Sequence, residues 1–261
     1  MKNIDQKYLI NYNSSVLEDS IYRIFKIEHL LEWFKTGKVA FCRPDEWEDP
    51  WEARLFKKSF RLNHNNLGVL PFMKLFYAQC WTRHEKESDL IWKLYSPNRT
   101  GVRVKTKINQ FYDYLIKSNE FVNFEHIYHN PEFFLGKVKY YQEREIKRVT
   151  KLIKGHFRNS KTIVNRKKRL DKSIVNILFK KRIAFHHEKE FRFVYCTNNL
   201  SYKSLHSNTS KLFHFTINPL DIIDEILFDP RMDEKTFEEH RRTLWAYKFI
   251  NPIKQSTLYK I

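Results

Sequence analysis

The sequence predicts a single α+β domain, because short apolar strand patterns and amphipathic helix patterns are interspersed along its 261 residues. Hydrophobic residues make up 42% of the chain and aromatic residues 16%, which is enough to bury a substantial core. Glycine is scarce, with 5 residues, and neither G-x-G-x-x-G nor G-x-x-x-x-G-K occurs. The missing motifs argue against Rossmann and P-loop nucleotide sites.

Hydrophobic spacing locates most of the elements. Strands are predicted at 21–25, 39–42, 78–82, 101–105, 137–142, 186–196, 212–217 and 222–228. Helices are predicted from residue 27 to a stop at Gly37, from the Ser88-Asp89 cap through Tyr95, and from Asp233 to Trp245. Residues 106–135 are aromatic-rich and fit neither pattern clearly.

Positive charge is concentrated in one segment. Residues 137–182 contain 17 Lys or Arg and 3 acidic residues, so +14 of the net charge of +18 lies there. Two amphipathic patterns predict a basic helical insertion at 143–182 within the single domain 1–261, with its basic sides in water. A surface of this kind suits nucleic-acid phosphates. The residues expected to contact them are Lys154, Arg158, Arg166, Lys167, Lys168 and Arg169.

The sequence shows no secretory signal and no apolar stretch of membrane-spanning length. Its three cysteines, Cys42, Cys80 and Cys196, are odd in number, far apart and without C-x-x-C spacing. We therefore expect a cytoplasmic protein with reduced thiols and no membrane contact.

The predicted strand 186–196 carries an unusual charged face. Alternation places Glu188, Glu190 and Arg192 on one side, and aromatic residues such as Phe191 and Phe193 on the other. Two neighbouring carboxylates raise each other's pKa unless a cation intervenes, and Arg192 could supply that cation. The pattern fits either an exposed edge strand with ion pairs or a functional site.

A series of local motifs resembles a bacterial family of unknown function. The motifs occur in the family's order between residues 20 and 245. They are Tyr22-Arg23, the Gly37–Phe41 turn and strand, Arg43-Pro-Asp45 with Asp49-Pro-x-Glu52, Cys80-Trp-Thr82, Trp92-x-x-Tyr95, Gly101-Val102 and Glu188-Lys-Glu190-Phe-Arg192. The resemblance supports a site but does not supply its chemistry.

A second resemblance does suggest chemistry. An Arg on the first strand, a hydroxyl residue on a middle strand and a later Glu-x-Glu are similar to the arginine–serine–glutamate class of the ADP-ribosyltransferase superfamily. The resemblance implies an ADP-ribosyltransferase-like mixed or antiparallel sheet and NAD as a substrate. It also implies that Arg23 binds the diphosphate, Thr82 orients the nicotinamide ribose and Glu190 stabilises the oxocarbenium-like transition state. Glu188 would position the acceptor.

Several positions depart from that pattern. The middle strand reads Cys-Trp-Thr instead of Ser-Thr-Ser, and Arg43 competes with Arg23 as the diphosphate ligand. Trp92 or Tyr95 could stack on nicotinamide, as an aromatic residue does in the histidine–tyrosine–glutamate class.

We therefore expect an NAD-dependent ADP-ribosyltransferase that needs no metal and acts on nucleic acid, with RNA as one candidate acceptor. A toxin or phage-defence role would require an antitoxin or regulatory partner. Two alternatives remain. One is a nuclease that binds Mg²⁺ through Asp45, Glu46, Glu48, Asp49 and Glu52 together with the Glu-x-Glu pair. The other is a non-catalytic nucleic-acid-binding module in which the Glu-x-Glu-x-Arg strand is structural.

Overall fold

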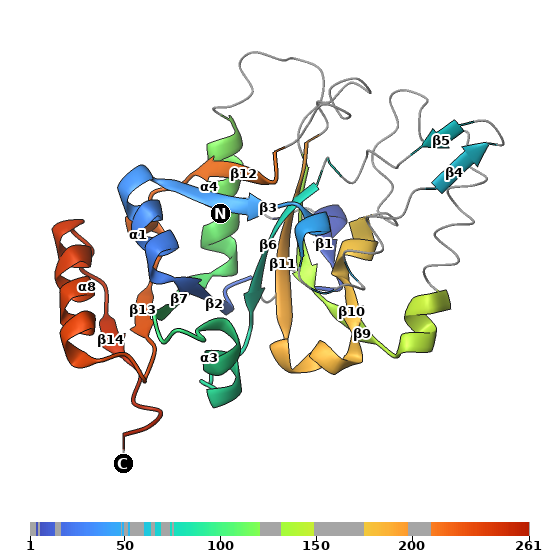
Figure 1. Cartoon of the computed structure of the whole chain (residues 1–261). Helices are drawn as coiled ribbons and strands as arrows, with labels where there is room; N and C mark the ends of the chain where they lie inside the picture. The colour runs from blue at the N-terminus through green and yellow to red at the C-terminus, as the bar shows by residue number, and fades with distance from the viewer. Residues whose placement is uncertain are drawn as a thin grey trace.

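A computed structural model of the chain (Figure 1) describes residues 4, 6–13, 17–47, 49, 52, 60–63, 66–68, 74, 76–120, 132–148, 175–197 and 210–260. The described strands of the main sheet are β1 (Leu9–Ile10), β2 (Ser20–Lys26), β3 (Lys38–Cys42), β6 (Phe76–Thr82), β7 (Gly101–Lys107), β8 (Glu132–Lys137), β11 (Glu190–Cys196), β12 (Leu212–Thr216), β13 (Glu225–Phe228) and β14 (Ile253–Gln255). Two ribbons stand apart from it, β4 (Phe60–Asn63) with β5 (Asn66–Gly68) and β9 (Lys139–Tyr141) with β10 (Lys180–Arg182).

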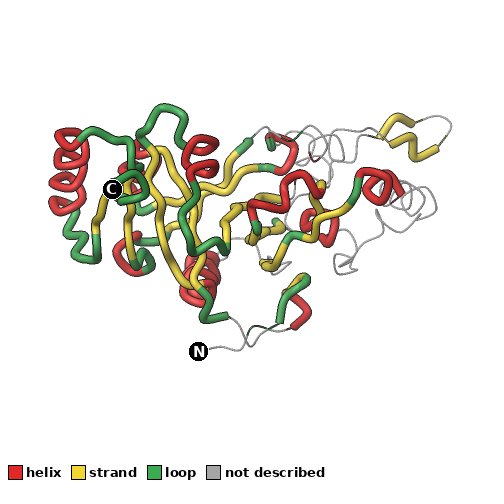
Figure 2. Tube along the Cα trace, turned by 90° about the horizontal axis from the view of Figure 1, so that it is seen from below, coloured by secondary structure: helices red, strands yellow, loops and turns green. Residues whose placement is uncertain are grey.

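The main path of the sheet runs β1-β8-β11-β6-β2-β7-β13-β14. Most neighbours are antiparallel, whereas β1 with β8, β13 with β14, and β9 with β10 are parallel. The α-helices whose bounds are defined are α1 (Ile27–Thr36), α3 (Asp89–Tyr95), α4 (Ile108–Glu120) and α8 (Glu234–Ala246). The predicted α+β class with a mixed sheet is confirmed. In Figure 2, α8 lies at one end of the molecule and the β4–β5 ribbon at the other.

Strand β6 is shared by two different neighbours on one of its edges. Thr82, at its end, pairs with Tyr22 of β2, whereas Ala78 pairs with Cys42 of β3. The backbone of Cys80 lies between these two contacts. Arg23 fills the gap, because its Nη1 donates to the Cys80 carbonyl at 2.8 Å. The opposite edge of β6 pairs with β11 along its whole length, with Glu190 opposite Thr82.

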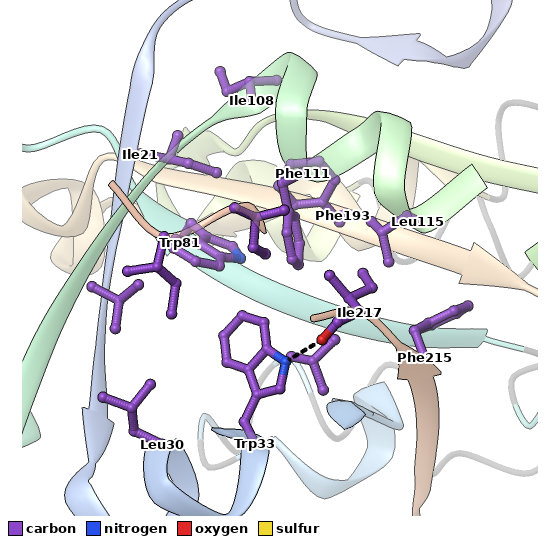
Figure 3. Close-up of a cluster of buried hydrophobic side chains, with 14 of the residues drawn as sticks. Ile21, Leu30, Trp33, Trp81, Ile108, Phe111, Leu115, Phe193, Phe215 and Ile217 are labelled. Carbon is purple, nitrogen blue, oxygen red and sulfur yellow. Dashed lines mark hydrogen bonds between the residues drawn. The ribbon is translucent and has the colours of Figure 1, made fainter. Parts of the chain in front are cut away.

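The main core is aromatic and lies on one face of β6 and β11. Trp81 of β6 and Phe193 of β11 pack around Phe111 of α4, with ring centroids 5.2 and 4.9 Å from it. Trp33 of α1 is buried beside them, and its Nε1 donates to the Ile217 carbonyl at 2.8 Å (Figure 3). Burial of these rings provides much of the driving force for folding and fixes β11 in place.

Several elements match their prediction. Gly37 caps α1 in the left-handed conformation, with φ of 66°, and its amide bonds the Trp33 carbonyl. Asp233 caps α8 by accepting from the Thr236 amide. Ser88 occupies the cap position of α3, although its side chain makes no capping hydrogen bond.

Other elements differ from their prediction. The expected strand 186–196 begins only at Glu190, because residues 183–188 form the 3₁₀-helix η7 and Lys189 turns the chain with φ of 43°. Residues 137–142 contribute to two strands, β8 and β9. The expected second basic helix ends as the short 3₁₀-helix η6 (Asn176–Phe179) followed by β10. Helix α4 lies in the segment that the pattern left unassigned, and β14 was not predicted. In the described part of the chain, no helix is both long and apolar enough to cross a bilayer.

Candidate active site

Five charged side chains meet on the second face of β11, opposite the aromatic core. Arg192 is at the centre, with 1% of its surface exposed. Its Nε lies 2.8 Å from Oε1 of Glu190, and its Nη2 lies 2.9 Å from Oε2 of Glu190 and 2.7 Å from Oε1 of Glu52. The fork geometry of a guanidinium suits such a two-point contact with a carboxylate. Arg192 therefore joins the start of β11 to the loop that contains Glu52.

Lys181 of β10 is the second cation of this group. Its Nζ lies 2.7 Å from Oε2 of Glu188, 3.3 Å from Oε2 of Glu190 and 3.7 Å from Oε2 of Glu52. All five side chains are buried. We call Glu52, Lys181, Glu188, Glu190 and Arg192 the charge cluster. It contains three carboxylates and two cations, so one negative charge is in excess.

The carboxylates of the charge cluster are not equivalent. Burial alone would raise the pKa of Glu190, but Arg192 and Lys181 outweigh it and lower the pKa to about 2. Glu52 has fewer compensating contacts, so burial raises its pKa above the ordinary range. Burial would lower the pKa of Lys181, yet Glu190, Glu52 and Glu188 raise it. Glu190 is consequently a carboxylate at any physiological pH.

Polar groups from other elements surround the two acids of the Glu-x-Glu motif. The Thr82 hydroxyl donates to the Glu188 carbonyl at 2.6 Å, and the Glu190 amide donates to the Tyr140 hydroxyl at 2.8 Å. Tyr95 of α3 is 45% exposed, and burial together with Glu188 raises the pKa of its hydroxyl. Thr82 and Tyr140 are partly exposed and Tyr95 is exposed, so none of these three neighbours of the Glu-x-Glu motif is buried.

A small cleft borders Thr82. Its lining includes Arg23, Thr82 and Trp92. Thr82 joins the cleft to the segment that carries the two glutamates, because its hydroxyl donates to the Glu188 backbone carbonyl and its backbone pairs with that of Glu190.

Three cations, Arg23, Lys86 and Arg103, and one acid, Glu87, line the cleft. Arg103 is held by hydrogen bonds from its Nη2 to the His84 carbonyl at 2.6 Å and the Glu85 carbonyl at 2.5 Å, and it stacks on Tyr22 with 3.9 Å to the ring centroid. Burial lowers the pKa of His84, and the nearby charges of Lys189 and Arg103 lower it further. A cleft whose arginines are fixed in place in this way favours anionic groups such as phosphates.

The predicted NAD-contacting residues separate into two groups. Arg23, Thr82 and Trp92 line the cleft. Trp92 is nevertheless 1% exposed and donates from Nε1 to Glu87 Oε2 at 3.0 Å, so Tyr95 is the aromatic side chain with an accessible face. Arg43 does not line the cleft. Its guanidinium binds Asp45 at two points, at 2.9 and 2.8 Å.

The acidic loop considered for Mg²⁺ forms ion pairs with protein cations. Besides the Arg43–Asp45 pair, Asp49 binds Arg182 at 2.9 Å and Glu52 binds Arg192 at 2.7 Å. Among the described residues no group of three or more His, Cys, Asp or Glu side chains is arranged to hold a metal ion. Glu48 lies outside the described residues.

The basic residues expected to contact nucleic acid also lie outside the described part of the chain. They are Lys154, Arg158, Arg166, Lys167, Lys168 and Arg169. Their role stays a prediction.

Lys181 is the member of the charge cluster that was not predicted from sequence. It occurs in Lys180-Lys181-Arg182, at the end of the basic segment. Among so many basic residues, the sequence alone does not distinguish the one lysine that points inward. The strand period could have revealed it, since only the middle residue of β10 is buried. The helical assignment of this stretch concealed that signal.

Comparison with solved structures finds three complexes of DarT from Thermus sp. 2.9. The complex with NAD+ has a TM-score of 0.38 and 10% identity and covers 92% of this chain and 96% of that chain. The complex with ADP-ribosylated ssDNA has a TM-score of 0.36 and 11% identity over 94% and 95% of the two chains. The complex with carba-NAD+ has a TM-score of 0.34 and 12% identity over 91% and 95%. Likeness at this level does not transfer a function.

A search of curated proteins found no match. A family model described as "Protein of unknown function (DUF2971)" matches residues 91–193. That span contains Trp92, Tyr95, Lys181 and the segment from Glu188 to Arg192. The match confirms the resemblance to a family of unknown function, and over residues 91–193 this chain is similar to that DUF2971 family.

Proposed function

We propose that this protein is an NAD-dependent ADP-ribosyltransferase that modifies nucleic acid. The observation that carries the proposal is the position of Thr82. Its side chain lines the cationic cleft with Arg23, while its hydroxyl and backbone contact Glu188 and Glu190. In the proposal, Arg23 and Thr82 of the cleft act together with Glu190, whose backbone pairs with that of Thr82.

The electrostatics of the two halves of this site match the two ends of the substrate. The cleft with Arg23 and Arg103 suits the diphosphate of NAD. The charge cluster, with one negative charge in excess, lies beyond Thr82, where the nicotinamide ribose would reach Glu190. Positive charge develops on the ribose as the glycosidic bond breaks, so a fixed carboxylate there lowers the barrier.

The transfer itself balances without any further reactant. The bond between ribose C1′ and the nicotinamide nitrogen breaks, and nicotinamide leaves with the electron pair as a neutral molecule. A nucleophilic atom of the acceptor forms the new bond to C1′ and loses its proton to solvent or to a site carboxylate. Glu188, beside Tyr95 near the surface, is the carboxylate that we assign to the acceptor side.

The ribose must reach a carboxylate that already has partners. Glu190 is 6% exposed, and its carboxylate contacts Arg192 at two points. Lys181 Nζ lies 3.3 Å from Glu190 but only 2.7 Å from Glu188, so the lysine is held more closely by Glu188. A ribose hydroxyl can therefore displace the lysine from Glu190 without breaking the guanidinium contact.

The acceptor class rests on the charge of the chain. The +14 segment at 137–182 favours a polyanion such as single-stranded nucleic acid. RNA as the acceptor, a toxin or phage-defence role, an antitoxin partner and cytoplasmic location are part of the same proposal.

A non-catalytic nucleic-acid-binding module is the second candidate. The observation in its favour is that the five members of the charge cluster neutralise one another almost completely, as a purely structural network would. In that case the basic segment alone would explain the function.

The deciding experiment uses NAD labelled in its adenylate part, with single-stranded DNA, single-stranded RNA or no acceptor. The proposal predicts labelled nucleic acid with the wild type and none with Glu190→Gln, in the presence or absence of a chelator. Lys180→Met is the matched control, because Lys180 is next to Lys181 but lies outside the charge cluster. Label released only as free ADP-ribose would make the protein an NAD hydrolase. Nucleic acid bound without any NAD turnover would support the binding module and contradict the transferase.

A further inference from the structure

Lys181 is placed where it controls both acids of the Glu-x-Glu motif. Strand β10 runs parallel to β9, with Lys181 opposite Tyr140. Lys181 is 8% exposed, in contrast to the flanking Lys180 and Arg182, which are partly exposed. The two-stranded ribbon therefore presents Lys181 to the charge cluster as a single inward-facing cation.

The ammonium group of Lys181 connects three separate segments. Its ion pairs reach Glu52 in the acidic loop, Glu188 in η7 and Glu190 in β11. Arg192 reaches Glu52 and Glu190, so among the described ion pairs only Lys181 neutralises Glu188. Removing the lysine would leave three buried carboxylates facing one guanidinium.

We propose that Lys181 is a positioning residue that holds the Glu188 and Glu190 carboxylates in place and releases Glu190 to the substrate while it retains Glu188. This proposal rests on the proposed transferase function. The geometry supports it because the Nζ–Glu188 distance of 2.7 Å is shorter than the Nζ–Glu190 distance of 3.3 Å. Without the lysine, both carboxylates would lose the cation that they share, and of the two only Glu190 would keep an ion pair with Arg192 among those described.

Several charged and titratable side chains face the Lys181 ammonium group. The charged ones are the other four members of the charge cluster, Glu52, Glu188, Glu190 and Arg192. Tyr140 of β9 and Tyr95 of α3 also feel its charge, and the Phe185 ring lies 4.8 Å from Nζ. The two tyrosine hydroxyls stay neutral because burial raises their pKa, so the glutamates are the groups that respond to loss of the lysine.

A first measurement needs no enzymatic activity. The free energy of unfolding is measured by urea between pH 3 and pH 8 for the wild type, Lys181→Met and Lys180→Met. Loss of the cation raises the folded-state pKa of the carboxylates, so protonation relieves the defect. We expect Lys181→Met to be destabilised most at pH 7 and to approach the wild type as the pH falls below about 4. A deficit that is the same at every pH would mean that Lys181 acts only through packing, and it would overturn the proposal.

A second variant keeps the test valid if Lys181→Met does not fold at neutral pH. Lys181→Met combined with Glu188→Gln removes the cation together with the carboxylate that depends on it. We expect the double variant to be more stable at pH 7 than Lys181→Met alone. A double variant that is as unstable as, or less stable than, the single one would contradict the pairing.

The third measurement is the pH profile of nicotinamide release. Lys181→Met should lower kcat at pH 7 at least tenfold, leave KM for NAD within about threefold, and move the acidic limb upward by at least one pH unit. Lys181→Arg should restore most of kcat, and Lys180→Met should match the wild type. An unshifted acidic limb in Lys181→Met would refute the positioning role. If the wild type itself releases no nicotinamide, the proposed transferase function is wrong. The pH dependence of unfolding then still tests whether Lys181 compensates the buried carboxylates.

Discussion

Strand β11 has an aromatic face, whereas its second face is charged at Glu190 and Arg192 and apolar at Val194 and Cys196. The aromatic face and this charged part of the second face are built in different ways. On the aromatic face, Phe191 and Phe193 pack into a core of many interchangeable apolar contacts. On the charged face, Glu190 and Arg192 are held by a few directional contacts with side chains of distant segments, Glu52 and Lys181. Stability on the first face grows with buried area, whereas on the second it depends on every partner being present.

This difference indicates which face of β11 can hold a functional site. A network of buried ions adds little net stability over an apolar replacement, because desolvation offsets most of the attraction. Apolar packing on both faces of β11 also holds the strand in the sheet. Under the proposed function, the charged residues serve the chemistry of an ionised Glu190, whose backbone pairs with that of Thr82.

The strongest test of the contrast is Arg192→Met. The variant leaves Glu52 and Glu190 buried with Lys181 as their remaining cation. We expect a loss of about 3–5 kcal/mol in the free energy of unfolding at pH 7, the range for an uncompensated buried charge. Urea denaturation measures this loss. Recovery of stability on adding Glu52→Gln would assign part of the loss to the Glu52 carboxylate. A loss below about 1 kcal/mol would show that the network is not coupled as described.

Acidification should affect the charged face in a defined pH window. The folded-state pKa of Glu190 is lowered from 4.5 to about 2, so its ionisation stabilises the native state above the unfolded-state value. That contribution, roughly 2–3 kcal/mol, should be lost as the pH falls from about 5 to about 2. The unfolding free energy of the wild type relative to Glu190→Gln should shrink over this range. A difference that stays constant from pH 7 to pH 2 would contradict the lowered pKa.

A smaller effect is expected on the aromatic face. Trp33→Phe removes the bond from Nε1 to the Ile217 carbonyl but retains a ring in the core. We expect a loss of about 1–2 kcal/mol from the unsatisfied carbonyl, equal at pH 5 and pH 8. Thermal or urea unfolding at the two pH values measures it. A loss that differs between pH 5 and pH 8 would contradict the proposed difference between the aromatic face and the charged residues.

Much of the fold could be predicted because the spacing of hydrophobic residues within one element can be read from that stretch of sequence alone. The alternation along β11 predicted Glu190 and Arg192 on one face and Phe191 and Phe193 on the other. The start of the strand was misplaced, since nothing in the local pattern signals a left-handed lysine at 189. Residues that favour this conformation, such as glycine and asparagine, are absent there.

The candidate site was less accessible from sequence than the fold. Arg23 and Thr82 could be identified by their order along the chain, and the structure brings them to one cleft. The partners Lys181 and Glu52 are 129 residues apart in the sequence, and no spacing rule links them. Their meeting depends on tertiary packing of β10 and the acidic loop against β11, which periodicity does not encode.

The most direct measurement is nicotinamide release from NAD by the wild type, Glu190→Gln and Trp33→Phe, each compared at the same folded concentration. We expect release by the wild type, a loss of at least about 10²-fold in Glu190→Gln, and an unchanged rate in Trp33→Phe. Equal rates for the wild type and Glu190→Gln, or no release by the wild type with or without nucleic acid, would contradict it.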